Sequence, residues 1–188
     1  MRVIILVGTL ALLSACGEDR EAQEDAAIAK AEAAIAELST QLGGKLKQAL
    51  GEGGPAAAIK VCSEVAQQIS REIGEKHGLT IRRTALRVRN PANAPDEWER
   101  ETLEMLEPRF NDPKSEVSME GIVLADSAEV RVLKPIRLQA LCAMCHGAPE
   151  RLDPEVVKTV TAVYPDDQAV GFKPGDLRGA FSVRVPLD

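Results

Sequence analysis

The sequence has few aromatic residues, few histidines and few cysteines. Its 188 residues include one Trp, one Tyr, three Phe, two His and four Cys. The hydrophobic fraction of 45% leans on alanine, so few large side chains are available to fill an interior. The chain also has no internal repeat, which excludes a solenoid. Its length fits a single domain with a helical leader.

Excess basic charge is also lacking, since the net charge is −6. Phosphate binding requires clustered basic residues, so nucleic acid is not expected as a partner. Many of the acidic residues lie between Glu18 and Asp25, and this cluster indicates a solvated spacer.

Apart from the first residues, no stretch is apolar enough to cross a membrane. Met1-Arg2 is a short basic start, residues 3–13 are almost wholly apolar, and the run is too short for a permanent span. The sequence Leu13-Ser14-Ala15-Cys16 resembles a bacterial lipobox, which implies cleavage before Cys16 and lipid attachment to it. We therefore expect a signal peptide over residues 1–15, an acidic spacer over 16–27 and one domain over 28–188.

This export signal predicts a periplasmic, membrane-anchored lipoprotein. Gly17 follows the anchor where an acidic residue would favour the inner membrane, so resemblance to lipoprotein sorting in enteric bacteria favours the outer membrane.

Apolar residues at steps of three and four predict two helices in the first half of the chain. The first carries Ile28, Ala31, Ile35, Leu38, Leu42 and Leu46 on one face. A glycine-rich run from Gly51 to Pro55 ends it, and Pro55 suits the first turn of the next helix. The second carries Ala58, Cys62, Val65, Ile69 and Ile73 on one face.

The second half of the chain alternates between β-forming and polar residues in several places. This pattern predicts strands over residues 79–90, 118–124, 129–136 and 181–185. Helices are expected over residues 97–110, with Asp96 as N-cap, and over 154–163. Regular βαβ alternation is lacking, so the expected fold class is α+β, an antiparallel sheet flanked by helices and preceded by long N-terminal helices.

The segment Cys142-Ala143-Met144-Cys145-His146 has the spacing of a c-type haem attachment site. Two thiols separated by two residues reach vinyl groups on neighbouring pyrroles, and the adjacent imidazole is then delivered to the iron. A zinc or iron–sulfur site needs four ligands, and only Cys62 and His77 remain to complete one. A thioredoxin-like redox pair would require a βαβ unit. We therefore predict one covalently attached haem c, which would also help to fill the core.

The second axial position of the iron has several candidate ligands in the sequence. They are Cys62, His77, Met105, Met119 and Met144. Met144 lies inside the attachment loop, and His77 precedes a glycine at a helix end, which is typical of a surface residue. Cys62 lies on an apolar helix face, where it is either an inert core thiol or a ligand protected by coordination.

An arginine-rich segment, with Arg82, Arg83, Arg87 and Arg89, stands out in this acidic chain. It is either a solvated strand face or a set of partners for the haem propionates through charge-assisted hydrogen bonds. The candidate cofactor-binding arginines are Arg83, Arg87 and Arg89.

Four segments together resemble a bacterial family of c-type haem domains with a PAS-like fold. They are the run from Arg83 to Pro95 followed by Trp98-Glu99, then Lys134-Pro135-Ile136, the haem motif with Gly147, and the run from Gly175 to Val183. The family occurs as free proteins and as input domains of membrane sensor kinases. The resemblance implies a PAS-like sheet, haem bound against it, and His146 with Cys62 as the axial pair.

A thiolate ligand stabilises ferric iron and lowers the reduction potential. With both axial sites filled, the first expectation is a one-electron carrier, and an enzyme that needs an open iron site is not expected. The alternative is a redox or gas sensor that acts through a partner protein. The chain lacks the transmitter domain of the kinase-linked members, and either a redox partner or a signalling partner is consistent with the sequence.

Overall fold

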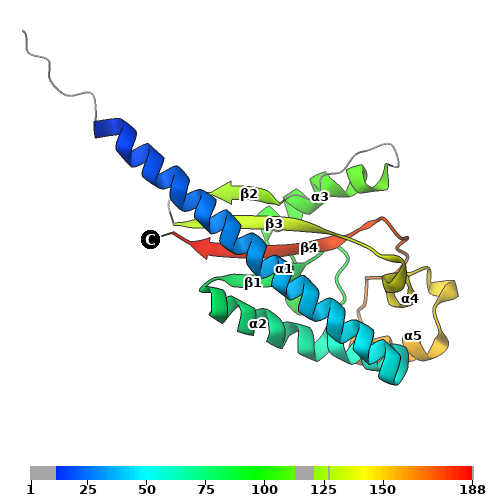
Figure 1. Ribbon diagram of the computed structural model, residues 1–188. Helices are drawn as coiled ribbons and strands as arrows, with labels where there is room; N and C mark the ends of the chain where they lie inside the picture. Colours follow the sequence, from blue (N-terminus) through cyan, green and yellow to red (C-terminus); the bar gives the residue numbers. More distant parts are fainter. Residues whose placement is uncertain (1–11, 113–120, 127, 188) are drawn as a thin grey trace, which may run out of the picture.

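The computed structural model describes residues 12–112, 121–126 and 128–187. They form a four-stranded antiparallel sheet with helices on both faces (Figure 1). The strand order is β1-β4-β3-β2, and the strands are β1 (Thr80–Thr84), β2 (Ile122–Ala125), β3 (Glu129–Arg137) and β4 (Leu177–Pro186). The predicted α+β class is confirmed.

A long helical region precedes the sheet. It consists of α1 (Leu12–Lys60), a π-helical turn (Val61–Val65) and α2 (Ala66–His77). Gly54 interrupts α1 with φ 66° and ψ −162°, so the helix breaks inside the predicted glycine run. Glycine adopts this backbone conformation without the steric cost that a Cβ atom imposes.

The first helix begins earlier than the apolar stripe predicts, because α1 includes the acidic segment over residues 16–27. Arg20 and Glu24 form an i,i+4 ion pair of 2.8 Å there, and Arg20 Nη2 donates to the carbonyl oxygen of Asp126. Ala27 and Ala31 are already buried in the core. Ala27 thus extends the packed face by one residue before Ile28, and the Arg20 contacts belong to the helical segment that precedes it.

The sheet separates two hydrophobic clusters. On one face α1 and α2 pack against strand residues such as Ile81, Val132 and Val183. On the other face α3 (Glu97–Asn111) packs through Leu103, Leu106 and Phe110. Figure 1 shows α1 crossing the sheet diagonally with α2 beside it.

The N-terminus of α3 has the capping box expected from Asp96. The Asp96 side chain accepts from the backbone N–H of Glu99, and the Glu99 side chain accepts from the backbone N–H of Asp96. Asp96 Oδ2 also lies 2.6 Å from Arg131 Nη2 and 2.7 Å from Arg184 Nη2. These ion pairs join α3 to β3 and β4.

The strand predicted over residues 79–90 is too long, since β1 ends at Thr84. Beyond Thr84 the alternating residues contact other partners: Arg87 stacks on Phe172, and the carbonyl oxygen of Val88 accepts from Gln168. The predicted strand over 118–124 is observed as β2, and residues 118–120 lie outside the described ranges. The final strand starts four residues earlier than predicted, at Leu177.

The remaining helices lie at the end of the sheet beside the last part of α1 (Figure 1). They are α4 (Ala143–His146) and α5 (Pro154–Val163), and α5 has the predicted bounds. Asp153 caps α5 by accepting from the backbone N–H of Glu155. Among the described helices, none is both long enough and apolar enough to cross a membrane.

Candidate functional site

The Cys-x-x-Cys-His motif follows β3 and occupies a 3₁₀ turn and the short helix α4. Backbone hydrogen bonds between Leu138 and residues 175–176 fix the chain just before the motif. Cys142 and Cys145 are three positions apart on this helical segment, so they lie on one side of it. Both are free thiols and both line the same cavity.

His146 is oriented by the segment that follows α5. Its Nδ1 lies 2.7 Å from the carbonyl oxygen of Ala169, and the backbone N–H of Phe172 donates to the carbonyl oxygen of His146. An Nδ1–H that donates to a carbonyl leaves Nε2 as the unprotonated ring nitrogen, which is the arrangement typical of a metal-binding histidine. Burial, followed by the positive charges of Arg178 and Arg89, holds the pKa of His146 well below its usual value.

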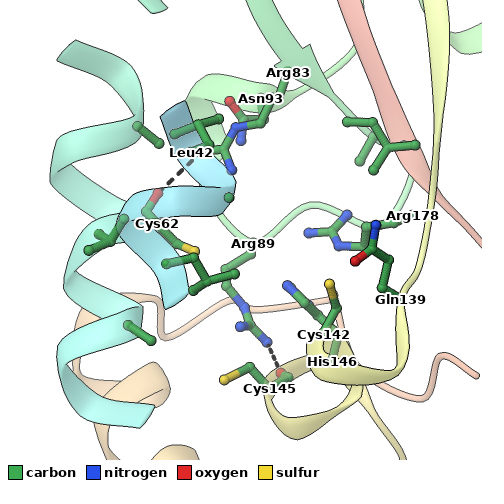
Figure 2. Close-up of a pocket in the computed structure, with 18 of the residues that line it drawn as sticks. Leu42, Cys62, Arg83, Arg89, Asn93, Gln139, Cys142, Cys145, His146 and Arg178 are labelled. Atoms are coloured by element: carbon green, nitrogen blue, oxygen red, sulfur yellow. Dashed lines mark hydrogen bonds between the residues drawn. The ribbon is translucent and has the colours of Figure 1, made fainter. Parts of the chain in front are cut away.

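A cavity of about 300 Å³ lies between the long helices, the end of the sheet and the motif. Figure 2 shows the motif on one wall and the helix that carries Cys62 on the opposite wall. Much of the lining is apolar and includes Leu42, Leu46, Leu50, Ile59, Ile136 and Phe181. An apolar cavity with convergent polar groups is typical of a cofactor site.

Cys62 lies in the π-helical turn Val61–Val65 and is half-buried. Its carbonyl oxygen accepts from Arg83 Nη2 at 3.3 Å, a contact marked in Figure 2. A π-helical turn within a longer helix is uncommon and often marks a functional residue. The structure therefore brings Cys62 to the same cavity as the predicted attachment motif.

Of the other proposed axial ligands, Met144 lines the cavity but belongs to the attachment segment itself. His77 ends α2, and its Nε2 lies 2.9 Å from Glu37 Oε2. Met105 is exposed on α3, on the far face of the sheet. Met119 lies outside the described residues.

The three predicted cofactor-binding arginines occupy different positions. Arg83 and Arg89 line the cavity, whereas Arg87 stacks on Phe172 at 3.4 Å and is absent from the described lining. Arg89 is held in a buried ion pair of 2.9 Å with Asp167 and also donates to the carbonyl oxygen of Cys145 at 2.7 Å. Arg89 thus fastens the motif to the 167–172 segment.

Arg178 also lines the cavity, and it is absent from the predicted binding residues. Its position follows from an irregularity in the pairing of β3 with β4, where Ile136 pairs with Gly179 and Arg137 with Leu177. Periodicity in the sequence gives no indication of such an irregularity. The glycine next to Arg178 is the one local signal.

The residues present fit a haem better than a small metal ion. Within the described ranges there is no group of three or more His, Cys, Asp or Glu side chains that could hold a metal ion. A porphyrin supplies four of the six ligands of its iron, so one residue on each wall is sufficient. Cys16 lies within the span of α1, away from these walls, and the structure does not describe its side chain.

Comparison with known proteins agrees with this fit. A family model described as Tll0287-like matches residues 17–186. The crystal structure of the cyanobacterial haem protein Tll0287 superposes with a TM-score of 0.61 at 27% sequence identity, and the match covers 84% of this chain and 93% of that chain. No curated protein matches the chain significantly. The predicted resemblance to a family of haem domains is confirmed.

Proposed function

Because the chain belongs to the Tll0287-like family, we propose that it is an exported, lipid-anchored c-type haem protein that transfers single electrons. The relationship to a haem protein makes it a haem-binding protein. Covalent attachment, axial ligation, export and electron transfer are our extensions of that statement.

One observation carries the proposal: the two thiols and the imidazole of the motif line one cavity, with Nδ1 of His146 already bonded to Ala169. The two thiols would hold the porphyrin, and His146 would bind the iron through its remaining ring nitrogen. Bound haem supplies an iron centre that accepts and releases one electron. Arg89 holds the motif against the segment that contains Asp167, because it contacts both Asp167 and the carbonyl oxygen of Cys145.

Cys62 is the proposed second axial ligand because it lies on the opposite wall from His146 (Figure 2). With both His146 and Cys62 bound to it, the iron would have no open coordination position for a substrate. The proposal therefore includes no enzymatic activity. Arg83 is the remaining predicted partner for a propionate, since Arg87 lies outside the described lining and Arg89 is paired with Asp167.

The lipid anchor rests on Cys16 and the apolar run before it. It supports a periplasmic protein that contacts the membrane through the lipid. Gly17 favours the outer membrane, and the proposed partner is a redox protein.

The test is the mass of the denatured protein, produced in cells that mature c-type cytochromes. We expect polypeptide plus one haem for the wild type, because thioether bonds survive denaturation. C142S and C145S should each lose one of the two attachments, and the double variant should carry no covalent haem. The control C62S should retain the haem mass, because a ligand thiol forms no bond to the porphyrin. A bare polypeptide mass for the wild type would refute the proposal.

A haem-based sensor is a second candidate, supported by the π-helical turn at Cys62. A π-helical turn converts to α-helix by a small local change, so release of Cys62 on reduction would shift α2 relative to α1.

Carbon monoxide distinguishes the two functions. A carrier with both axial positions filled should show the same reduced optical spectrum with and without the gas. A sensor should show a changed spectrum, accompanied by a change in far-ultraviolet circular dichroism on reduction.

A further inference from the structure

The charged side chains around the cavity have one sign. Its described lining contains four arginines, Arg83, Arg89, Arg137 and Arg178, and no aspartate or glutamate. The whole chain has a net charge of −6. A cationic lining in an acidic protein indicates an anionic ligand, since like charges gathered in an interior are unfavourable without a counter-charge.

Two of these arginines do not require a ligand as counter-charge, because one is paired with a carboxylate and the other is exposed to solvent. Arg89 is neutralised by Asp167, and the two side chains are each 9% exposed. Arg137 is exposed, donates to the carbonyl oxygen of Gly175 and stacks on Phe110 at 4.6 Å. Arg83 and Arg178 remain as cavity arginines with no carboxylate within ion-pair distance among the described residues.

Arg178 is the more deeply placed of these two. Its side chain is half-buried, and its guanidinium faces the cavity between Arg89 and Gln139 (Figure 2). Its hydrogen bond in the structure is a 3.3 Å contact from Nη1 to the carbonyl oxygen of Arg87, which leaves most of its five N–H donors for another group. Burial and the neighbouring Arg89 and Arg83 lower the pKa of Arg178 to about 10, so the group is still charged at neutral pH.

A β-bulge gives Arg178 this orientation. Between the pairs Ile136–Gly179 and Arg137–Leu177, β3 advances by one residue and β4 by two, so Arg178 is the extra residue. Gly179 has φ 151°, and a Cβ atom there would overlap the carbonyl oxygen of Thr84. Bulges next to functional sites commonly redirect a side chain that a regular strand would point elsewhere.

We propose that Arg178 binds a propionate carboxylate of the haem and compensates its charge inside the cavity. The inference rests on the proposed haem function and adds the residue that recognises the acidic edge of the cofactor. A guanidinium can form two parallel hydrogen bonds with a carboxylate, so it fixes orientation as well as charge.

The experiment compares haem-loaded wild type with R178Q, R178K and R184Q. Arg184 is the matched control, because it lies on the same strand, carries the same charge, pairs with Asp96 and is not part of the described cavity lining. The measurements are the midpoint potential by spectroelectrochemical titration and the propionate bending band in the resonance Raman spectrum.

We expect R178Q to lower the midpoint potential and to shift the propionate band, because loss of a nearby positive charge favours oxidised iron. R178K should keep a potential close to that of the wild type, and R184Q should change neither quantity. A haem-loaded R178Q with the wild-type potential and band would overturn the inference, as would an R184Q shift as large as that of R178Q.

If R178Q does not accumulate, the inference is tested by the propionate band of R178K. An ammonium group cannot reproduce the planar two-bond contact, so its propionate band should shift, and an unshifted band would overturn the inference. Wild-type protein without haem would refute the proposed function itself, which separates that failure from the failure of Arg178 alone.

Discussion

Cys62 shows how the surroundings of one residue decide its chemistry. The sequence leaves it as either a core thiol or an iron ligand, and the structure places it on the cavity wall opposite the attachment motif. Arg83 donates to its backbone carbonyl oxygen, and Cys62 lies within the π-helical turn. These contacts favour the ligand role over inert packing.

We expect C62S to change the ferric optical and EPR spectra and to raise the reduction potential. Serine is a much weaker ligand than thiolate, so the electron donation that stabilises ferric iron is lost. The control is H77Q, which removes the other imidazole at its contact with Glu37 and should leave both spectra unchanged. Unchanged ferric spectra in C62S would show that Cys62 is not an axial ligand.

Sequence patterns predict the attachment motif of the site but not the positions of its arginines. The motif predicts Cys142, Cys145 and His146 because its spacing is set by the porphyrin. Arg87 and Arg178 could not be placed in this way, because alternation reports the face of a side chain only along a regular strand. The chain leaves the sheet after Thr84, and the bulge in β4 reverses the expected direction at Arg178.

Among the elements, α3 depends most visibly on one residue at its start. Asp96 caps the helix and also pairs with Arg131 and Arg184. Burial raises the pKa of Asp96, but the backbone N–H of Glu99 and the guanidinium of Arg131 outweigh it and leave the pKa below its ordinary value. Different substitutions of Asp96 can therefore separate the contribution of its N-cap hydrogen bond from that of its negative charge.

D96A should lower the free energy of unfolding by about 1–2 kcal/mol, the usual cost of losing an N-cap. D96N should cost less, because asparagine still caps the helix and loses only the ion pairs. Urea denaturation followed by circular dichroism measures both.

The contribution of the Asp96 charge to stability depends on pH. It is present above the unfolded pKa and is lost as the pH falls through the folded pKa, so the difference in unfolding free energy between wild type and D96N should vanish in acid. A difference that grows on acidification would contradict this account.

Element boundaries followed the sequence wherever local chemistry sets them. Asp96 and Asp153 begin α3 and α5 at the predicted positions, and the glycine run breaks α1 at Gly54. The boundaries that depend on distant contacts were wrong: the early part of α1 contacts Asp126 through Arg20, and the early end of β1 rests on contacts with residues 168–172.

On the scale of the whole molecule, two layers of helices enclose one sheet, and the proposed haem site lies at one end of it (Figure 1). The α+β class follows from the lack of βαβ alternation in the sequence. The location of the site cannot be predicted from the sequence in this way. It is built from α1, the π-helical turn, the end of β4 and α4, which are far apart in the chain.

The stretch of α1 from position 16 to Leu42, which precedes the break at Gly54, limits how the proposed anchor and the proposed electron transfer could be combined. Helical rise of 1.5 Å per residue separates position 16 from the cavity wall at Leu42 by up to about 39 Å. If α1 stands away from the bilayer, a lipid at position 16 would keep the cavity out of contact with a donor embedded in the bilayer. Exchange would have to take place with proteins that project into, or diffuse through, the aqueous space around the helix.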